Sequence, residues 1–235
     1  MSNSKNDPKL STGNPPILAW LDGPEGDSRS WRRPALVSLV LVVTAVGILK
    51  MLGRTWWCQC ETLHFWIGDN WSLHNSQHLL DPYTFSHFQH GLLLYGLLFM
   101  VAKKGSPAVR MVVAIALESS WEVLENTSWI IEKYRGSTMS LDYYGDSIVN
   151  SVSDIASCAL GFGFAAALPA VLSVLSFVIV EVAMLVCVRD SLLLNMIMLF
   201  CPIDRIKDWQ MSDAMDSVFW LFEPVCAVSR FWIQH

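Results

Sequence analysis

The sequence predicts an all-α protein, a polytopic bundle of transmembrane helices with five to six spans. Two observations support this fold class. Hydrophobic residues make up 53% of the chain and charged residues only 16%, whereas about a quarter of an average soluble domain is charged. The apolar residues also occur in long continuous blocks, and a helix needs about 20 such residues to cross the hydrocarbon core of a bilayer.

The chain begins with a polar stretch, 1–33, that is rich in proline, glycine, serine and aspartate. This composition predicts a disordered tail. The stretch lacks the early apolar core of a cleavable signal peptide, so the first apolar segment is expected to remain as an anchor. That segment is 34–52, "PALVSLVLVVTAVGILKML", which contains a single charged residue.

Four more segments continue the predicted transmembrane domain, which we place at 34–210. They are 87–102, 108–131, 146–168 and 170–188. The apolar segment 191–201 is too short for a full span, so we expect it to lie at the interface or to re-enter the membrane. Residues 211–235 are expected to form a weakly structured or interfacial extension.

Positively charged residues indicate how the spans are oriented. They flank the first span and fill the loop between the second and third spans: Arg29, Arg32, Arg33, Lys103, Lys104 and Arg110. Residues 55–86 contain no lysine or arginine. Because positively charged loops stay in the cytoplasm, we expect a cytoplasmic N-terminus and place 55–86 on the opposite, outer face.

Histidines gather at this outer face. The loop contributes His74 and His78 together with Asp81, and the start of the second span contributes His87 and His90. Spacing predicts that each pair of histidines shares one face wherever its segment is helical.

Two acidic stripes are expected to meet the histidines. At about 100° per residue, Glu118, Glu122 and Glu125 share one face of the third span. The fourth span begins at the same level with a second polar set: Asp142, Asp146, Asn150 and Asp154. A carboxylate that faces lipid at mid-helix costs about 2.5 kcal/mol or more, so both stripes should face the interior of the bundle.

Two kinds of site would satisfy so many buried carboxylates. One is a divalent metal such as zinc or manganese. Its predicted ligands are His78, His87, His90, Asp146 and Asp154. There Glu122 would act as general base on metal-bound water, and Glu118 and Glu125 would be general acids. The other kind is a metal-free network that shares protons; the plainest alternative is that His87 and His90 only hydrogen-bond between helices.

Two smaller features have structural as well as functional interpretations. Cys58 and Cys60 form a C-x-C in the outer loop, a pattern that serves as a metal or redox motif in some proteins and has a plain structural use in most. Gly161 and Gly163 predict places where the fourth span approaches another helix closely.

Four runs of the sequence resemble a known family: "GRTWWC", "HNSQHLLDPYTFSHFQHG", "ESSWEVLENTSWIIEKYR" and "DYYGDSIVNSVSDIASC". It is a multi-pass bacterial inner-membrane family of unknown function, found mostly in alphaproteobacteria, and the resemblance covers about 34–210. It implies an inner-membrane location and supplies no substrate. The runs "SHFQHG", "WEVLEN" and "DSIVNSVSDIASCALG" are also similar to VanZ-like membrane proteins, which are associated with glycopeptide tolerance at the cell envelope.

Three functions fit these observations. The first is a metal-dependent membrane enzyme that acts on a lipid or lipid-linked envelope substrate at the periplasmic side. The second is a non-catalytic scaffold or envelope-stress protein whose polar network is structural. The third is a proton- or cation-coupled transporter, which the apolar inner halves of the second and third spans disfavour. Membrane lipids are the expected partners, and the lack of a basic face argues against nucleic acid.

Overall fold

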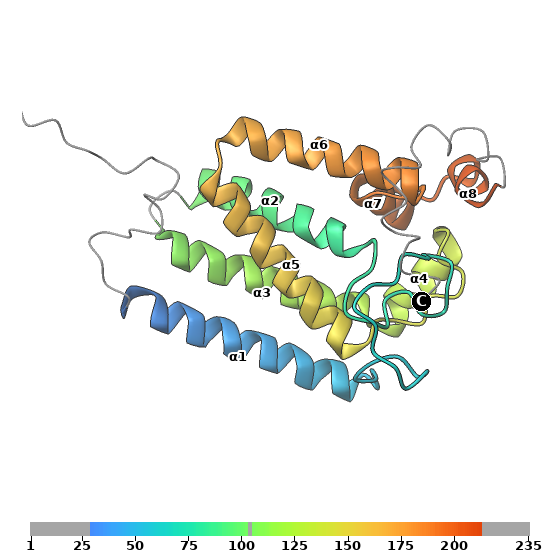
Figure 1. Ribbon diagram of the computed structural model, residues 1–235, viewed down its shortest axis with the longest axis horizontal. Helices are drawn as coiled ribbons and strands as arrows, with labels where there is room; N and C mark the ends of the chain where they lie inside the picture. Colours follow the sequence, from blue (N-terminus) through green and yellow to red (C-terminus); the bar gives the residue numbers. More distant parts are fainter. Residues whose placement is uncertain (1–28, 103–104, 213–235) are drawn as a thin grey trace, which may run out of the picture.

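A computed structural model describes residues 29–102 and 105–212, and Figure 1 shows their arrangement. Within these residues the protein consists of helices and loops without a β-strand, so the predicted fold class is confirmed. Most of the predicted tail (1–28) and most of the predicted C-terminal extension (213–235) lie outside the described residues.

Five long helices of the described chain form a bundle, and three shorter helices gather at one of its ends (Figure 1). The long helices are α1 (Arg29–Met51), α2 (Thr84–Val101), α3 (Pro107–Glu125), α5 (Ile148–Ala167) and α6 (Ala170–Cys187). The short helices are α4 (Ser128–Ser137), α7 (Leu192–Phe200) and α8 (Asp204–Met211). The connection 52–83 folds over the same end as the short helices, and we call this the capped end.

The expected span 108–131 is two helices, because the chain breaks between α3 and α4. Asn126 ends α3: its side-chain amide donates to the carbonyl oxygen of Glu122 at 3.0 Å and to the carboxylate of Asp146 at 2.7 Å. Side-chain bonds of this kind compete with the helical ladder. α4 therefore belongs to the capped end and not to a span.

Three helices of the described residues are long and apolar enough to cross a membrane: Trp31–Met51, Ile148–Ala167 and Ala170–Cys187. In α1 and α6 only 11% and 6% of the apolar window is buried, so most of their side chains face outward, as expected of helices in contact with lipid. α1 begins at Arg29, five residues before the expected start at 34. α2 and α3 lie in the same bundle and carry polar residues along one half; that they complete five spans stays a prediction.

The half of the bundle away from the capped end has an apolar interior. Leu98, Ala114 and Phe162 are buried against one another, and Leu94 and Tyr95 pack onto them. The buried histidines and carboxylates of α2, α3 and α5 lie in the other half, whereas Arg110 of α3 is buried in this half against Tyr95 and Phe99. The one-sided distribution that the sequence predicts for the second and third spans is therefore present in the folded bundle.

α2 and α5 approach so closely that glycine is required at the contact. An added Cβ at Gly91 of α2 would overlap the carbonyl oxygen of Cys158, and one at Gly161 of α5 would overlap that of Phe88. The predicted close approach at Gly161 is thus confirmed. The prediction for Gly163 is wrong, because nothing lies within 4 Å of the position its Cβ would take.

A buried carboxyl group ties the start of α7 to the start of α2. Asp190 is fully buried. It accepts hydrogen bonds from the amide of Ser191 at 2.9 Å, from Nδ2 of Asn195 at 3.0 Å and from the hydroxyl of Tyr83 at 3.3 Å. Burial raises the pKa of Asp190 from 3.8 to about 6, because it outweighs the hydrogen bonds, which lower it.

This raised pKa predicts that stability falls as the pH rises. The folded chain keeps the Asp190 proton where the unfolded chain has lost it, so the stabilisation is complete below about pH 4 and is lost as the pH rises through about 6. The unfolding free energy should differ between about pH 5 and about pH 7.5, and we expect this difference to be about 1–2 kcal/mol smaller in Asp190→Asn than in the wild type. Thermal unfolding in detergent at about pH 5 and about pH 7.5 measures this, with the exposed Asp208→Asn as control. An unchanged pH dependence in Asp190→Asn would contradict the prediction.

Candidate functional site

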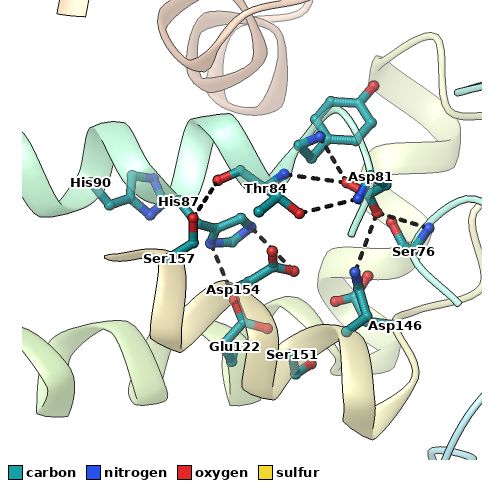
Figure 2. A network of polar contacts seen from close by, with 12 residues as sticks. Ser76, Asp81, Thr84, His87, His90, Glu122, Asp146, Ser151, Asp154 and Ser157 are labelled. Carbon is teal, nitrogen blue, oxygen red and sulfur yellow. Dashed lines mark hydrogen bonds and ion pairs between the residues drawn. The ribbon is translucent and has the colours of Figure 1, made fainter. Parts of the chain in front are cut away.

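The start of α2 is fixed by Asp81, which the sequence places in the polar constellation. Asp81 Oδ1 accepts hydrogen bonds from the amides of Tyr83 at 2.7 Å and Thr84 at 3.2 Å. Its Oδ2 accepts from the amide of Ser76 at 2.9 Å (Figure 2) and from Nδ2 of Asn150 at 3.4 Å. Asp81 therefore satisfies the free amides at the start of α2 and ties this helix to α5. Asp81 and Asn150 position the site.

Glu118 of α3 holds both histidines of α2. Its Oε1 lies 2.7 Å from Nδ1 of His87 and 3.0 Å from Nδ1 of His90, and its Oε2 lies 3.1 Å from the latter nitrogen. A carboxylate only accepts hydrogen bonds, so both rings donate through Nδ1. Each neutral ring then keeps an unprotonated Nε2, the atom that can bind a metal or accept a proton.

His87 also lies beside Glu122 and Asp154 (Figure 2). Its Nδ1 is 3.2 Å from Glu122 Oε1, and its Nε2 is 3.9 Å from Asp154 Oδ2. The first contact is not a hydrogen bond, because the single hydrogen on Nδ1 goes to the closer Glu118 oxygen. Glu122 Oε1 therefore has no hydrogen-bond partner, and Asp154 Oδ1 has none either. Both residues are buried, at 1% and 3% exposed.

This cluster contains more acidic than basic groups. In the part of the chain that the structure describes, every ion pair joins His87 or His90 to Glu118, Glu122 or Asp154. Buried carboxylates are costly unless a proton, a cation or a hydrogen-bond donor compensates them. The cluster therefore needs further positive charge, which a metal ion or additional protons would supply.

A cavity of about 60 Å³ adjoins the cluster. Six residues predicted from the sequence line it: His87, His90, Glu125, Asp146, Asn150 and Asp154. A space of this size holds a few water molecules, at about 10–15 Å³ each. Glu118 and Glu122 are not among the lining residues. Glu118 holds both histidines from α3, and Glu122, on the same helix as Glu118, lies beside His87 without bonding it.

Asp146 lines the cavity but is held by neutral donors. Its carboxylate accepts hydrogen bonds from Nδ2 of Asn126 at 2.7 Å and from the hydroxyl of Tyr143 at 3.0 Å. Burial raises the pKa of Asp146 to about 6, because it outweighs these hydrogen bonds. Sequence reasoning missed Asn126 and Tyr143. The spacing of Tyr143 and Asp146 offered a weak signal, whereas the role of Asn126 depends on the break after α3.

Two sets of residues around His87 offer ligand atoms within 4.8 Å of one another: His87, His90 and Glu118, and His87, Glu122 and Asp154. In the first set the two imidazoles already donate hydrogen bonds to the carboxylate. In the second set two carboxylate oxygens lack partners. The second set is therefore the better candidate for a metal. Asp146 and His78 belong to neither set, so the five predicted ligands do not come together.

The other predicted residues lie outside the cluster. His74 and His78 contact Cys58 and Cys60 in the connection 52–83. This connection has no helix, so the shared face that a helical segment would have given these histidines does not arise. Their rings still lie 5.6 Å apart, because turns in the connection bring them together. Asp142 is exposed and takes no part in the buried cluster.

Comparisons with known proteins agree with the bacterial resemblance seen in the sequence. Residues 49–212 match the family described as "Protein of unknown function (DUF2585)". A UPF0314 protein of Brucella anthropi is 42% identical over 78% of the chain and 93% of its own length. UPF0314 proteins of Paracoccus denitrificans and Rhizobium meliloti are 44% and 43% identical, over 73% and 76% of the chain and 89% and 92% of their own lengths. No solved structure matches the chain significantly.

Proposed function

The chain belongs to the DUF2585 family, and we propose that it is a metal-dependent hydrolase embedded in the bacterial inner membrane. The N-terminus lies in the cytoplasm in this proposal, and the capped end faces the periplasm. The substrate is a lipid or a lipid-linked intermediate of the cell envelope.

The observation that carries the proposal is the pair of unpartnered carboxylate oxygens beside His87. Glu122 Oε1 and Asp154 Oδ1 are buried without a donor, and a divalent cation would compensate both. One nitrogen and two carboxylates suit zinc or manganese. Three protein ligands leave coordination positions for water, as in catalytic sites. Glu118 would hold the ligating ring through Nδ1, the arrangement that orients metal-binding histidines in many proteins.

The cavity supplies the remaining parts of a hydrolytic site. A bound divalent metal would lower the pKa of its water toward neutrality. Glu118 leaves Nε2 of His90 unprotonated, so this ring can take a proton from the water as it attacks the substrate. The same proton then passes to the oxygen of the leaving group. The sequence predicted Glu122 as the general base, and in this proposal it is a metal ligand instead. Glu125 lines the cavity and keeps its predicted role as a general acid.

The walls of the cavity favour an amphiphilic substrate. Trp121, Leu192 and Met196 line it together with the acidic residues. The cavity has room for only a few water molecules, so it would take the reacting group of an amphiphilic substrate, and the rest of the lipid would lie outside it. The apolar cluster of Leu98, Ala114 and Phe162 lies in the other half of the bundle. This cluster favours a pocket that is open at one end and argues against a continuous transport path through the bundle.

Metal content is the test of this proposal. The protein is purified in detergent in a Cys58→Ser background, exposed to zinc and manganese, and analysed by mass spectrometry. We expect about one metal per chain, with affinity at least about 10-fold weaker in His87→Ala, Glu122→Gln and Asp154→Asn. The exposed Asp142→Asn is the control. Metal-loaded protein is then incubated with envelope lipids, and hydrolysis is followed by chromatography.

A folded protein that binds no metal would overturn the proposal of a metal-dependent hydrolase. His87 contacts three carboxylates, so an imidazolium would then compensate part of their charge. That outcome would favour the non-catalytic scaffold, whose buried network stabilises the bundle. In the scaffold, His87→Ala should lower the melting temperature, and added metal should not change it.

A further inference from the structure

A second group of potential ligands lies in the connection 52–83, apart from the cluster around His87. Cys58, Cys60, His74 and His78 each offer one ligand atom, and these atoms lie within 4.8 Å of one another. We propose that Cys58, Cys60 and His74 bind a thiophilic divalent ion, of which Zn²⁺ is the natural candidate, and leave a fourth coordination position open. His78 positions Cys60 by a hydrogen bond. This inference does not depend on the hydrolase.

The distances agree with a tetrahedral zinc site. Zinc–sulfur and zinc–nitrogen bonds of about 2.3 and 2.0 Å place a sulfur and a nitrogen of one tetrahedron about 3.5 Å apart. Cys58 Sγ lies 3.2 Å from His74 Nδ1. Cys58 is buried and Cys60 is exposed, so the ion would sit where the loop meets the surface.

The backbone around the cysteines is already folded for ligation. The amide of Glu61 donates to the carbonyl oxygen of Cys58 at 3.2 Å, which closes a turn over the C-x-C. The amide of Cys60 points at Cys58 Sγ from 3.4 Å. Such amide donors stabilise a thiolate. The amide of Leu80 donates to the carbonyl oxygen of Phe65 at 3.1 Å, which joins the cysteine and histidine segments.

His78 has a different role because of its tautomer. Its Nδ1 accepts a hydrogen bond from the backbone amide of His64 at 3.0 Å. The proton of the neutral ring is therefore on Nε2, and this nitrogen cannot bind the metal. Nε2 lies 3.9 Å from Cys60 Sγ and is the donor in that contact. His78 is 1% exposed, so the ring is held firmly where it orients the thiolate.

The proposed fourth coordination position would open onto a surface groove. Cys58, Cys60 and His74 line a groove of about 520 Å³ together with Arg135 and Asp142. Three protein ligands and one open position distinguish a reactive zinc site from a closed structural site. Water or a small anion from the groove would complete the tetrahedron.

Cobalt substitution tests this assignment on the full chain in detergent. The protein is reduced, stripped with a chelator and titrated with Co²⁺ in an Asp154→Asn background, which removes the other proposed centre. We expect about one cobalt with a thiolate charge-transfer band and the intense d–d bands of a tetrahedral ion, both displaced by Zn²⁺. Azide should shift the d–d bands, because the fourth position is open.

Variants separate the roles of the four residues. Cys58→Ser, Cys60→Ser and His74→Ala should abolish the charge-transfer band or weaken cobalt binding by at least about 100-fold, whereas His78→Ala should keep the band with binding about 10–100-fold weaker. Cys201→Ser is the matched control, because Cys201 is a free and exposed cysteine outside the group. Circular dichroism confirms folding of each variant.

Each of four results would overturn the proposal. The first is reduced wild-type protein without a thiolate–cobalt band, and the second is a Cys60→Ser variant that keeps both the band and the wild-type cobalt affinity. The third is loss of the band in folded His78→Ala, and the fourth is d–d bands that do not respond to azide. Either of the last two indicates a closed site with four protein ligands. A Cys58–Cys60 disulfide in the isolated protein, together with no metal binding after reduction, would indicate that the two cysteines form a redox pair and not a metal site.

Discussion

Glu118→Ala is expected to lower the free energy of unfolding by about 3–5 kcal/mol, the usual cost of removing one partner from a buried ionic network. Glu118 is 2% exposed and accepts hydrogen bonds from both His87 and His90. Its removal leaves Nδ1 of the buried His87 and Nδ1 of the partly buried His90 without an acceptor and frees both rings to rotate. Chemical or thermal unfolding in detergent measures the loss of stability.

Glu118→Gln separates the positioning role from the loss of volume. Glutamine keeps the size of the side chain and one oxygen that can accept from both rings. It removes the negative charge, however, and sets an NH2 donor where Oε2 lies 3.1 Å from Nδ1 of His90, so the rings are held less firmly. We expect this variant to remain folded and to bind metal at the His87 centre about 10–100-fold more weakly. Glu132→Gln, on the exposed surface of α4, is the control and should change stability by no more than about 0.5 kcal/mol. Unchanged metal affinity in Glu118→Gln would show that Glu118 does not orient the ligand.

The residues that sequence reasoning placed correctly are those on regular helices. Glu118, Glu122 and Asp154 were expected to face the bundle interior because a carboxylate cannot face lipid cheaply, and all three are buried. His87 and His90 lie one turn apart, so a single acceptor on α3 can reach both rings. Helical periodicity and the cost of burying charge were sufficient for this part of the site.

The errors fall where the chain is not helical. The connection 52–83 has no periodicity from which to place His78, whose position depends on turns and on the hydrogen bond from the His64 amide. Asp142 and Asp146 are four residues apart and have opposite environments, one exposed and one buried, because the segment between α4 and α5 is not helical and contains turns. The pairing of cysteines with histidines is likewise long-range, and a C-x-C motif alone does not predict it.

The contact between α2 and α5 connects the stability of the bundle with the geometry of the site. Gly91 follows His90 directly, and Gly161 lies two turns beyond Asp154 on α5. A methyl group at either glycine would meet backbone atoms of the other helix. Backbone atoms cannot move aside as a side chain can, so the two helices would have to separate.

Gly91→Ala and Gly161→Ala are therefore expected to cost at least about 3 kcal/mol each, at the upper end of the range for overpacked cores. The same separation would carry His87 Nε2 away from Asp154, which lies 3.9 Å away in the native bundle. Metal binding at the His87 centre should weaken together with stability, although neither glycine contacts the cluster.

Gly96→Ala in α2 and Gly163→Ala in α5 are the matched controls, because no atom lies within 4 Å of the position of either added Cβ. Alanine has the higher helix propensity, so each control should be neutral or should stabilise the protein by up to about 1 kcal/mol. Melting temperatures and metal titrations of the four variants test the argument together. Gly91→Ala and Gly161→Ala variants as stable as the controls would mean that the two backbones are not in contact, and the distance between His87 and Asp154 would then not be set by these glycines.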